Sequence, residues 1–295
     1  MIRAVVTDLD NTLYSWVNYI VPALEAMVDS LCETTGFPRI RVVQSLKEVY
    51  ERVGTNDYAF AIQESRIFQE FNGDFDSFQA LVIAPAKEAF SAARRKYLQP
   101  YPGAIEGLQA LRSLGLRVVG LTDAPRNSAE ARVRAIGLDE LLEAVYTLPG
   151  YPLPEWVDDR IRQADSEGRY RARIPLVELP AQHEKPDPRG LERVLADLGL
   201  EPREALVVGD NRWKDGGSAR AVGCPWAWAE YGTYLSLEYR ERLDTISARS
   251  ATRRHLAGPE GGGAPADPDF ALSNFAQVAG VVQALNGSAV LPKTA

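Results

Sequence analysis

The feature that most constrains the fold of this chain is a repeated alternation of short apolar runs with helical patterns. Four apolar runs are predicted to be buried strands, at Ile2–Thr7, Leu116–Leu121, Ala205–Val208 and Trp226–Ala229. Segments with helical spacing that stop at a glycine separate them, at Ala104–Leu114, Ser128–Ile136 and Pro188–Leu198. Strands that alternate with helices in this way predict an α/β fold, with a parallel sheet and helices on both of its faces.

Residues 14–100 interrupt the alternation. They contain long amphipathic helical patterns, at Val21–Leu31, Val42–Val53 and Ala84–Tyr97, and no convincing strand. The turn sequence Tyr101–Gly103 then returns the chain to the alternating pattern. We therefore expect a helical domain at 14–100, inserted into a core formed by residues 1–13 and 101–295.

Two further stretches of the core are predicted to be insertions, at about 149–180 and about 234–269. The first contains RYRAR, which places Arg169, Arg171 and Arg173 on one face if the backbone is extended. Because acidic residues lie close by in the sequence, this pattern favours a solvated flap over a nucleic-acid site. The second contains GPEGGGAPADP, which is typical of a flexible linker.

Composition excludes several classes of partner. With 295 residues and 45% hydrophobic content, the chain is long enough to bury a substantial core. A net charge of −7 and a pI near 5.1 disfavour general binding to nucleic acid or anionic membranes, which would be repelled.

The cysteines and the apolar runs give no indication of secretion or of a membrane anchor. The two cysteines, Cys32 and Cys224, form no disulfide framework, and the start MIRAVV lacks a secretory pattern. No apolar run approaches the roughly 20 residues that span a bilayer. These observations predict a cytoplasmic protein.

Polar residues follow the predicted strands at the edge where a parallel sheet binds ligands, beyond the carboxyl ends of its strands. Four acidic groups, one hydroxyl and one ammonium are expected to converge there, from Asp8, Asp10, Thr122, Lys185, Asp210 and Asp215. Extended backbone alternates its side chains, so Asp8 and Asp10 are both expected to face the crevice while Leu9 points elsewhere. One of two such carboxylates could attack a substrate while the other serves as acid and then base.

The remaining groups favour phosphoryl chemistry. Asp210 and Asp215 enlarge an all-oxygen cluster suited to Mg²⁺. Lys185 adds fixed positive charge and Thr122 a neutral donor, which together would hold a phosphoryl group. Two structural alternatives stay open: Thr122 as a hydroxyl that caps a strand end, and Asp215 as the N-cap of a helix.

These motifs resemble the signature of the haloacid dehalogenase superfamily. Its Asp-x-Asp-x-Thr motif matches Asp8, Asp10 and Thr12, and its Ser/Thr motif matches Thr122. Its lysine motif matches Lys185, and its final acidic motif matches Asp210 and Asp215. The resemblance covers roughly residues 1–13, 101–148, 181–232 and 269–286. It implies a Rossmann-like core with three α/β/α layers, and 14–100 sits where family members carry a cap domain.

The resemblance also implies roles for these residues. Asp8 would be the nucleophile that becomes an aspartyl-phosphate, and Asp10 would protonate the leaving group and then activate water. Mg²⁺ would be held by Asp8, the Asp10 backbone carbonyl and Asp210, with Asp215 binding directly or through water. Many relatives carry asparagine after the Ser/Thr of the second motif, whereas this chain has Asp123.

The expected function is Mg²⁺-dependent hydrolysis of a small phosphorylated metabolite. A dehalogenase does not need the second aspartate, so Asp10 counts against that activity. A phosphomutase would use the same residues, and a non-catalytic binding or regulatory protein would need none of them. With only His183 and His255 and no Gly-x-Ser-x-Gly, the sequence offers little for a serine or cysteine triad. Oligomeric state, a homodimer included, stays open.

Overall fold

The computed structural model of the protein describes residues 1–56, 58–71, 73–151, 153–157, 171–248 and 264–287. The chain divides into two compact units. The first, here the core unit, comprises Met1–Ser15, Pro100–Tyr234 and Gly258–Ala295. The second, here the helical unit, comprises Trp16–Gln99 and Leu235–Ala257.

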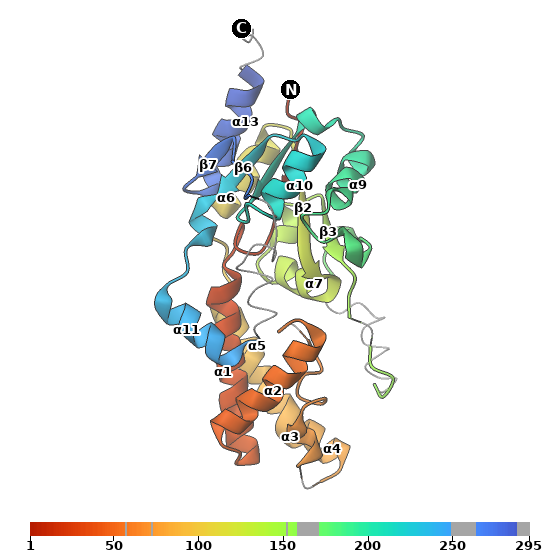
Figure 1. Ribbon diagram of the computed structural model, residues 1–295, viewed down its shortest axis with the longest axis vertical. Coiled ribbons are helices and arrows are strands. Elements are labelled where there is room, and N and C mark those ends of the chain that lie inside the picture. Colours follow the sequence, from red (N-terminus) through yellow and green to blue (C-terminus); the bar gives the residue numbers. More distant parts are fainter. Residues whose placement is uncertain (57, 72, 152, 158–170, 249–263, 288–295) are drawn as a thin grey trace. The chain divides into compact units, whose positions relative to one another are not determined.

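A seven-stranded sheet in the order β4-β3-β2-β1-β5-β6-β7 forms the centre of the core unit, and every neighbouring pair is parallel. Its strands are β1 (Ala4–Thr7), β2 (Arg117–Pro125), β3 (Ala144–Leu148), β4 (Leu176–Glu178), β5 (Ala205–Gly209), β6 (Trp226–Ala229) and β7 (Phe270–Leu272). Figure 1 shows the strands flanked by helices. The predicted α/β fold with a parallel sheet is confirmed.

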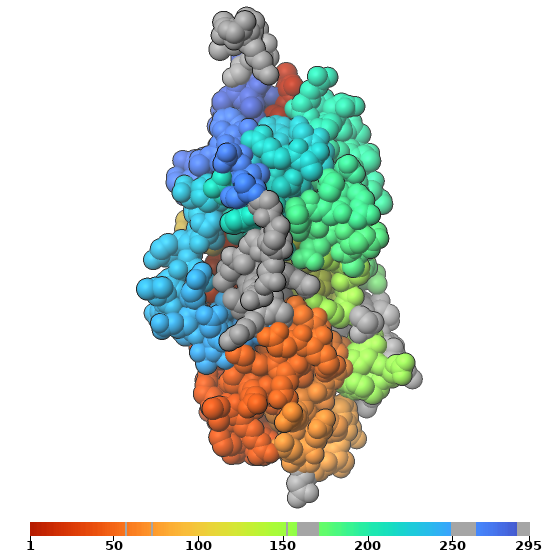
Figure 2. Space-filling view, viewed as in Figure 1, coloured from red at the N-terminus to blue at the C-terminus, as the bar shows by residue number. Residues whose placement is uncertain are grey.

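Helices cover both faces of this sheet. The helices of the core unit are α6 (Ala104–Ser113), α7 (Arg126–Ala135), α9 (Pro188–Leu198), α10 (Asp215–Val222) and α13 (Val278–Gly287). Short 3₁₀ turns join them at η2 (Leu138–Glu140), η3 (Ala181–His183), η4 (Pro202–Glu204), η5 (Glu230–Thr233) and η6 (Phe275–Gln277). On one face, α9 and α10 pack against each other and form the green and cyan surface in Figure 2. On the other, α6 and α7 pack on β2, and α13 packs on α6.

The buried core under α9 shows why the sequence folds in this way. Leucine or valine recurs along the helix with a spacing of three and four residues, at Leu191, Val194, Leu195 and Leu198. This stripe packs on alternate strand residues such as Ala4 and Val6. Because successive strand residues point to opposite faces, the intervening Val5 is buried toward the other helical layer.

The four strands predicted from sequence correspond to β1, β2, β5 and β6, which are neighbours in the middle of the sheet. Central parallel strands are buried on both faces and therefore appear as continuous apolar runs. The sequence analysis did not identify β3, β4 or β7. The edge strands β4 and β7 have only three residues each, partly exposed, so they leave no apolar run to detect.

The helical unit contains helices but no strand among its described residues. Its elements are α1 (Trp16–Thr35), α2 (Arg39–Val53), α3 (Arg66–Gln69), α4 (Phe75–Phe78), a π-helical turn η1 (Gln79–Ile83), α5 (Ala84–Tyr97) and α11 (Leu237–Ile246). The long helices α1 and α5 pack side by side, and α2 packs on α1 (Figure 1). None of the described helices has the length and apolar character needed to cross a membrane.

The assignment of α11 differs from the sequence analysis, which placed residues 234–269 in the core as an insertion. The helix packs on α1 and buries Leu243 and Ile246. Arg242 is paired with Glu25 of α1, with nitrogen–oxygen distances of 3.0 and 2.6 Å. These apolar and ionic contacts place the first part of the expected insertion in the helical unit.

The other expected insertion, 149–180, also departs from a simple flap. Arg169 lies outside the described residues, but the Arg171 carbonyl accepts a hydrogen bond from Arg134 and Arg173 is paired with Glu140. The chain then continues as β4, paired with β3. The last residues of this segment therefore belong to the edge of the sheet.

The expected glycine-rich linker is only partly described, because residues 249–263 lie outside the described ranges. Its end is held against the core unit. Arg212 is 2.6 Å from the Asp267 carboxylate, and the Trp226 indole donates a hydrogen bond to the Asp267 carbonyl at 3.0 Å. At least this end of the segment is therefore bound rather than free.

Gly232 in η5 provides a test of packing near the loop that follows β1. A Cβ at Gly232 would overlap the carbonyl oxygen of Asn11, and the neighbouring Tyr231 hydroxyl donates to the Thr12 carbonyl at 2.6 Å. We expect Gly232→Ala to lower the free energy of unfolding by about 1–3 kcal/mol, measured by thermal or urea denaturation.

The matched control is Gly280→Ala in α13, where a Cβ meets nothing within 4 Å. Because alanine favours a helix more than glycine does, this variant should gain about 0.5–1 kcal/mol. Equal stability of the two variants would show that η5 does not need a glycine.

Candidate active site

The loop after β1 carries the first two candidate residues. The Asp8 amide donates to the Val208 carbonyl at 2.8 Å, so pairing with β5 continues one residue beyond the strand. The Leu9 carbonyl then accepts the amides of Thr12 and Leu13, at 3.2 and 2.8 Å, which closes a tight turn. Because this turn begins at Leu9, the alternation of an extended strand does not continue to Asp10.

Asp8 lies in a cluster of carboxylates with Asp210 and Asp215. One carboxylate oxygen from each of the three lies within 4.8 Å of the others. Asp210 directly follows β5, and Asp215 is the first residue of α10. A Cβ at Gly209 would overlap the Asp215 carboxylate, so the absence of a side chain there makes the close approach feasible.

The loop from Asp210 to Asp215 is closed by its own hydrogen bonds. The Asn211 side-chain oxygen accepts the amides of Trp213 and Lys214, each at 3.0 Å. The backbone N–H of Asn211 donates to Asp215 Oδ2, also at 3.0 Å. Asp215 is therefore fixed toward the cluster by the turn that starts its helix.

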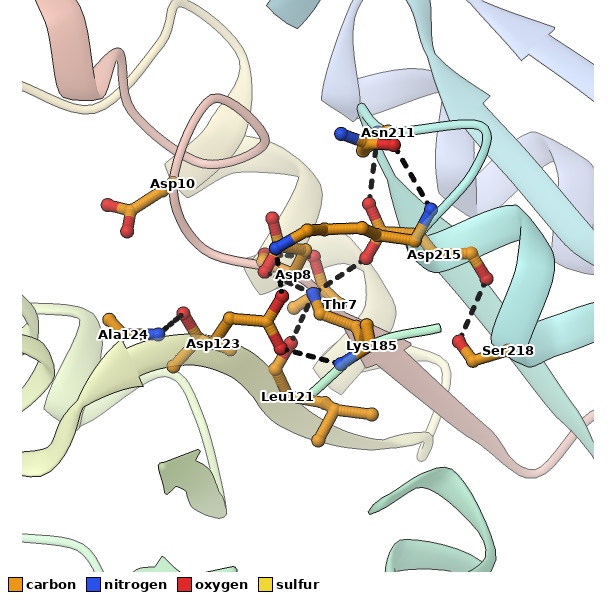
Figure 3. Close-up of polar contacts among 12 residues, drawn as sticks. Thr7, Asp8, Asp10, Leu121, Asp123, Ala124, Lys185, Asn211, Asp215 and Ser218 are labelled. Carbon is orange, nitrogen blue, oxygen red and sulfur yellow. Dashed lines mark hydrogen bonds and ion pairs between the residues drawn. The ribbon is translucent and has the colours of Figure 1, made fainter. Parts of the chain in front are cut away.

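Lys185 connects the cluster to β2. Its Nζ donates to Asp8 Oδ1 at 2.8 Å, to Asp215 Oδ1 at 2.6 Å and to the Leu121 carbonyl at 3.1 Å (Figure 3). The side chain is only 5% exposed. Three segments that are far apart in the sequence thus meet at one ammonium group.

Burial and like charge determine the electrostatics of the cluster. Burial raises the pKa of Asp8 to about 8, and the charge of Asp215 adds to this, although Lys185 opposes it. Burial, Asp215 and Asp8 likewise raise the pKa of Asp210 well above its usual value. For Lys185, burial would lower the pKa, but the surrounding carboxylates outweigh it and the net shift is upward.

The donor set of the cluster fits a divalent cation that prefers oxygen ligands. Three carboxyl groups converge on one ammonium, with Asp8 and Asp215 buried and Asp210 partly exposed, so the cluster carries excess negative charge once all three are ionised. Mg²⁺ would relieve this repulsion and matches carboxylate oxygen chemistry. Asp8, Asp210 and Asp215 are the residues that could hold it.

Thr122 and Asp123 lie beside this cluster, on β2. Thr122 is 2% exposed and lies within β2, three residues before its end, and its hydroxyl oxygen accepts the Ala124 amide at 3.1 Å. Asp123 accepts the Lys185 amide at 3.0 Å and the Lys214 ammonium at 2.9 Å. Burial would raise the pKa of Asp123, but Lys185 and Lys214 outweigh it and hold the pKa below its usual value.

Asp10 is separate from the cluster. Figure 3 shows its carboxylate turned away from the group around Lys185. Instead, Nη1 of Arg132 donates to both Asp10 oxygens, at 2.9 and 2.7 Å. Of the six candidate side chains, the structure thus brings together Asp8, Lys185, Asp210 and Asp215, with Thr122 adjacent and Asp10 apart.

The sequence analysis missed two residues of this site, Lys214 and Arg132. Lys214 pairs with Asp123 and, at 3.0 Å, with Glu184, and it precedes Asp215 in the final acidic motif. Arg132 lies on the buried face of α7 with Ala129 and Val133. A charged residue at an apolar position of a helix was the available signal for Arg132.

The chain matches the model of the haloacid dehalogenase-like hydrolases over residues 2–223 and belongs to this family, as the motifs predicted. It is 26% identical over 237 residues to a phosphoglycolate phosphatase of Thiobacillus denitrificans, covering 78% of this chain and 84% of that protein. It is 24% identical over 250 residues to a glyceraldehyde 3-phosphate phosphatase of Pyrococcus furiosus, covering 83% of this chain and 88% of that protein.

A solved structure shares the fold. The crystal structure of a 2-haloacid dehalogenase from Pseudomonas syringae superposes with a TM-score of 0.55 at 20% identity, covering 96% of this chain and 99% of that chain. At this identity the likeness concerns the fold alone.

The raised pKa values of the cluster predict how pH affects the metal-free protein. A carboxyl group whose folded pKa exceeds its unfolded value stabilises the fold at low pH and loses that contribution as pH rises. For Asp8 the loss extends from its ordinary value of 3.8 to about 8. In EDTA, we therefore expect the Tm of the wild type to fall across this range more steeply than the Tm of Asp8→Asn.

Addition of Mg²⁺ provides the complementary measurement. Because metal binding requires ionised carboxylates, Mg²⁺ should raise the Tm more near the upper end of the range than near the lower end. Parallel pH profiles of the wild type and Asp8→Asn in EDTA would contradict the assignment of these shifts to the cluster.

Proposed function

We propose that the protein is a Mg²⁺-dependent phosphohydrolase that cleaves small phosphorylated metabolites through an aspartyl-phosphate formed on Asp8. The observation that carries this proposal is the buried cluster in which Asp8 contacts Lys185 beside Asp210 and Asp215. A scaffold needs no such concentration of charge, because burying ionised groups is costly.

Asp8 and Asp10, which follow β1, would have different roles in a reaction of two steps. Asp8 would attack phosphorus, and the bond to the leaving oxygen would break as Asp10 gives that oxygen a proton. Asp10 would then take a proton from the water that hydrolyses the aspartyl-phosphate. Lys185 would balance negative charge on Asp8 and on the transferring group. When bound, Mg²⁺ would screen the charge of the phosphoryl oxygens.

The substrate class follows from the relatives and from the chemistry of the site. The relatives described above are named for phosphoglycolate and glyceraldehyde 3-phosphate, both small acyclic phosphate monoesters. We infer a substrate of this size class for this chain. The helical unit would serve as the cap that selects among such esters. Its helix α11 would be a cap element that comes from a later part of the sequence than the other cap helices.

The first test replaces the nucleophile. Asp8→Asn should abolish Mg²⁺-dependent release of phosphate, because an amide is nearly isosteric but does not attack phosphorus or bind the metal as a carboxylate does. Assays use 4-nitrophenyl phosphate and a panel of small metabolites that includes the two named above, with and without EDTA. Rapid acid quenching of the wild type should leave a phosphoryl adduct on the peptide that contains Asp8.

The matched control is Asp29→Asn, which removes an exposed carboxylate of α1 paired with Arg39 at the surface. It should retain wild-type turnover. Phosphate release by purified Asp8→Asn at the wild-type rate would overturn the proposal. Transfer of the phosphoryl group to a sugar phosphate, without net release, would indicate a phosphomutase instead.

The second test concerns Asp10. Acid catalysis typically contributes about 10²- to 10⁴-fold, so Asp10→Asn should lose on that order in the rate at which the leaving group is released from alkyl phosphates. For 4-nitrophenyl phosphate, whose leaving group needs little protonation, the loss should be much smaller. The measurement is the single-turnover rate of leaving-group release across a series of esters whose leaving groups differ in pKa, because hydrolysis of the aspartyl-phosphate is common to all of them. Equal losses of that rate across the series would assign Asp10 a different role.

A further inference from the structure

The ion pair between Arg132 and Asp10 is unusual for its burial. Arg132 is 2% exposed and the Asp10 side chain 8%, and a single guanidinium nitrogen donates to both carboxylate oxygens. The two residues are 122 positions apart in the sequence. Arg132 comes from α7, the helix that follows β2, and reaches the loop after β1.

Packing does not explain an arginine at this position. The same face of α7 is otherwise apolar, with Ala129 and Val133 fully buried. Replacing a buried ion pair with apolar residues of similar volume is often neutral or stabilising, because desolvation of both charges is costly. The fold therefore does not require a charged pair at these two positions, and the arginine calls for an explanation in terms of Asp10.

The direction of the Asp10 carboxylate supplies that explanation. Asp10 is only two residues from Asp8, yet it takes no part in the carboxylate cluster around Lys185. Figure 3 shows its carboxylate turned away from Asp8. The Lys185 ammonium and a metal held by the cluster would both attract a carboxylate free to rotate. Arg132 offers a competing cation on the other side.

We propose that Arg132 is a positioning residue that holds the Asp10 carboxylate apart from the metal ligands, in the orientation from which Asp10 would protonate the leaving group. The inference deepens the proposed function and rests on it. Arg132 itself exchanges no proton and touches no reacting atom. Its effect on turnover is exerted through the orientation of Asp10.

The test compares Arg132→Met, which keeps length and removes charge, with Arg132→Lys, which keeps charge and loses the guanidinium. Arg132→Met should lower kcat toward an alkyl phosphate such as glycerol phosphate by about 10- to 100-fold, within the range of acid–base catalysis. The KM should stay nearly unchanged, and the single-turnover release of 4-nitrophenol from 4-nitrophenyl phosphate should stay close to the wild-type rate. Arg132→Lys should recover part of the lost rate.

A double-mutant cycle separates positioning from a structural role. If Arg132 acts through Asp10, adding Arg132→Met to Asp10→Asn should cause no further loss toward the alkyl phosphate. The matched control is Arg134→Met on the exposed side of the same helix, where Arg134 binds only the Arg171 carbonyl among the contacts described for it. This control should keep wild-type kcat with both esters.

A readout independent of catalysis is the orientation of Asp10 in a crystal structure of Arg132→Met, where the carboxylate should adopt another rotamer. An unchanged rotamer, equal losses in the rate of leaving-group release with both esters, or additive losses in the cycle would overturn the inference. If Arg132→Met does not fold, the same comparisons with Arg132→Lys decide. Wild-type protein that releases no phosphate from any ester would overturn the proposed function and this inference with it.

Discussion

The contact on which the site depends is the Lys185 ammonium group, held between two buried carboxylates. It joins the end of β1, the start of α10 and the Leu121 carbonyl of β2, so the local folding of three segments is coupled to one charge. One ammonium does not balance three carboxylates, and burial amplifies the imbalance. The fold therefore preserves an excess of negative charge that a bound divalent cation would neutralise.

Two further basic side chains pair with carboxylates that lie outside the cluster. Lys214 binds Asp123 together with Glu184, and Arg132 binds Asp10. The basic residues thus sort the acidic ones into three separate groups, and only one of these groups has the geometry of a metal site.

Sequence alone predicted the central sheet and the residues of the cluster, because both leave local signals. β1 and β5 are continuous apolar runs, and each is followed directly by an aspartate in a recognisable motif. The ion pair of Arg132 was not predictable, because it joins two positions through tertiary packing. The short edge strand β4 escaped detection for a different reason: its pairing with β3 stabilises three residues that have little intrinsic pattern.

The placement of α11 has a consequence for dissecting or recombining this protein. The helical unit is assembled from two stretches of sequence, Trp16–Gln99 and Leu235–Ala257. A chimera that exchanged only the first stretch for that of a relative would leave Leu243 and Ile246 facing a foreign α1, and Arg242 without Glu25. Transplantation of the helical unit between relatives, to exchange the substrate preference proposed for it, therefore requires both stretches to move together. Natural variation in α1 is expected to be matched by compensating variation in α11.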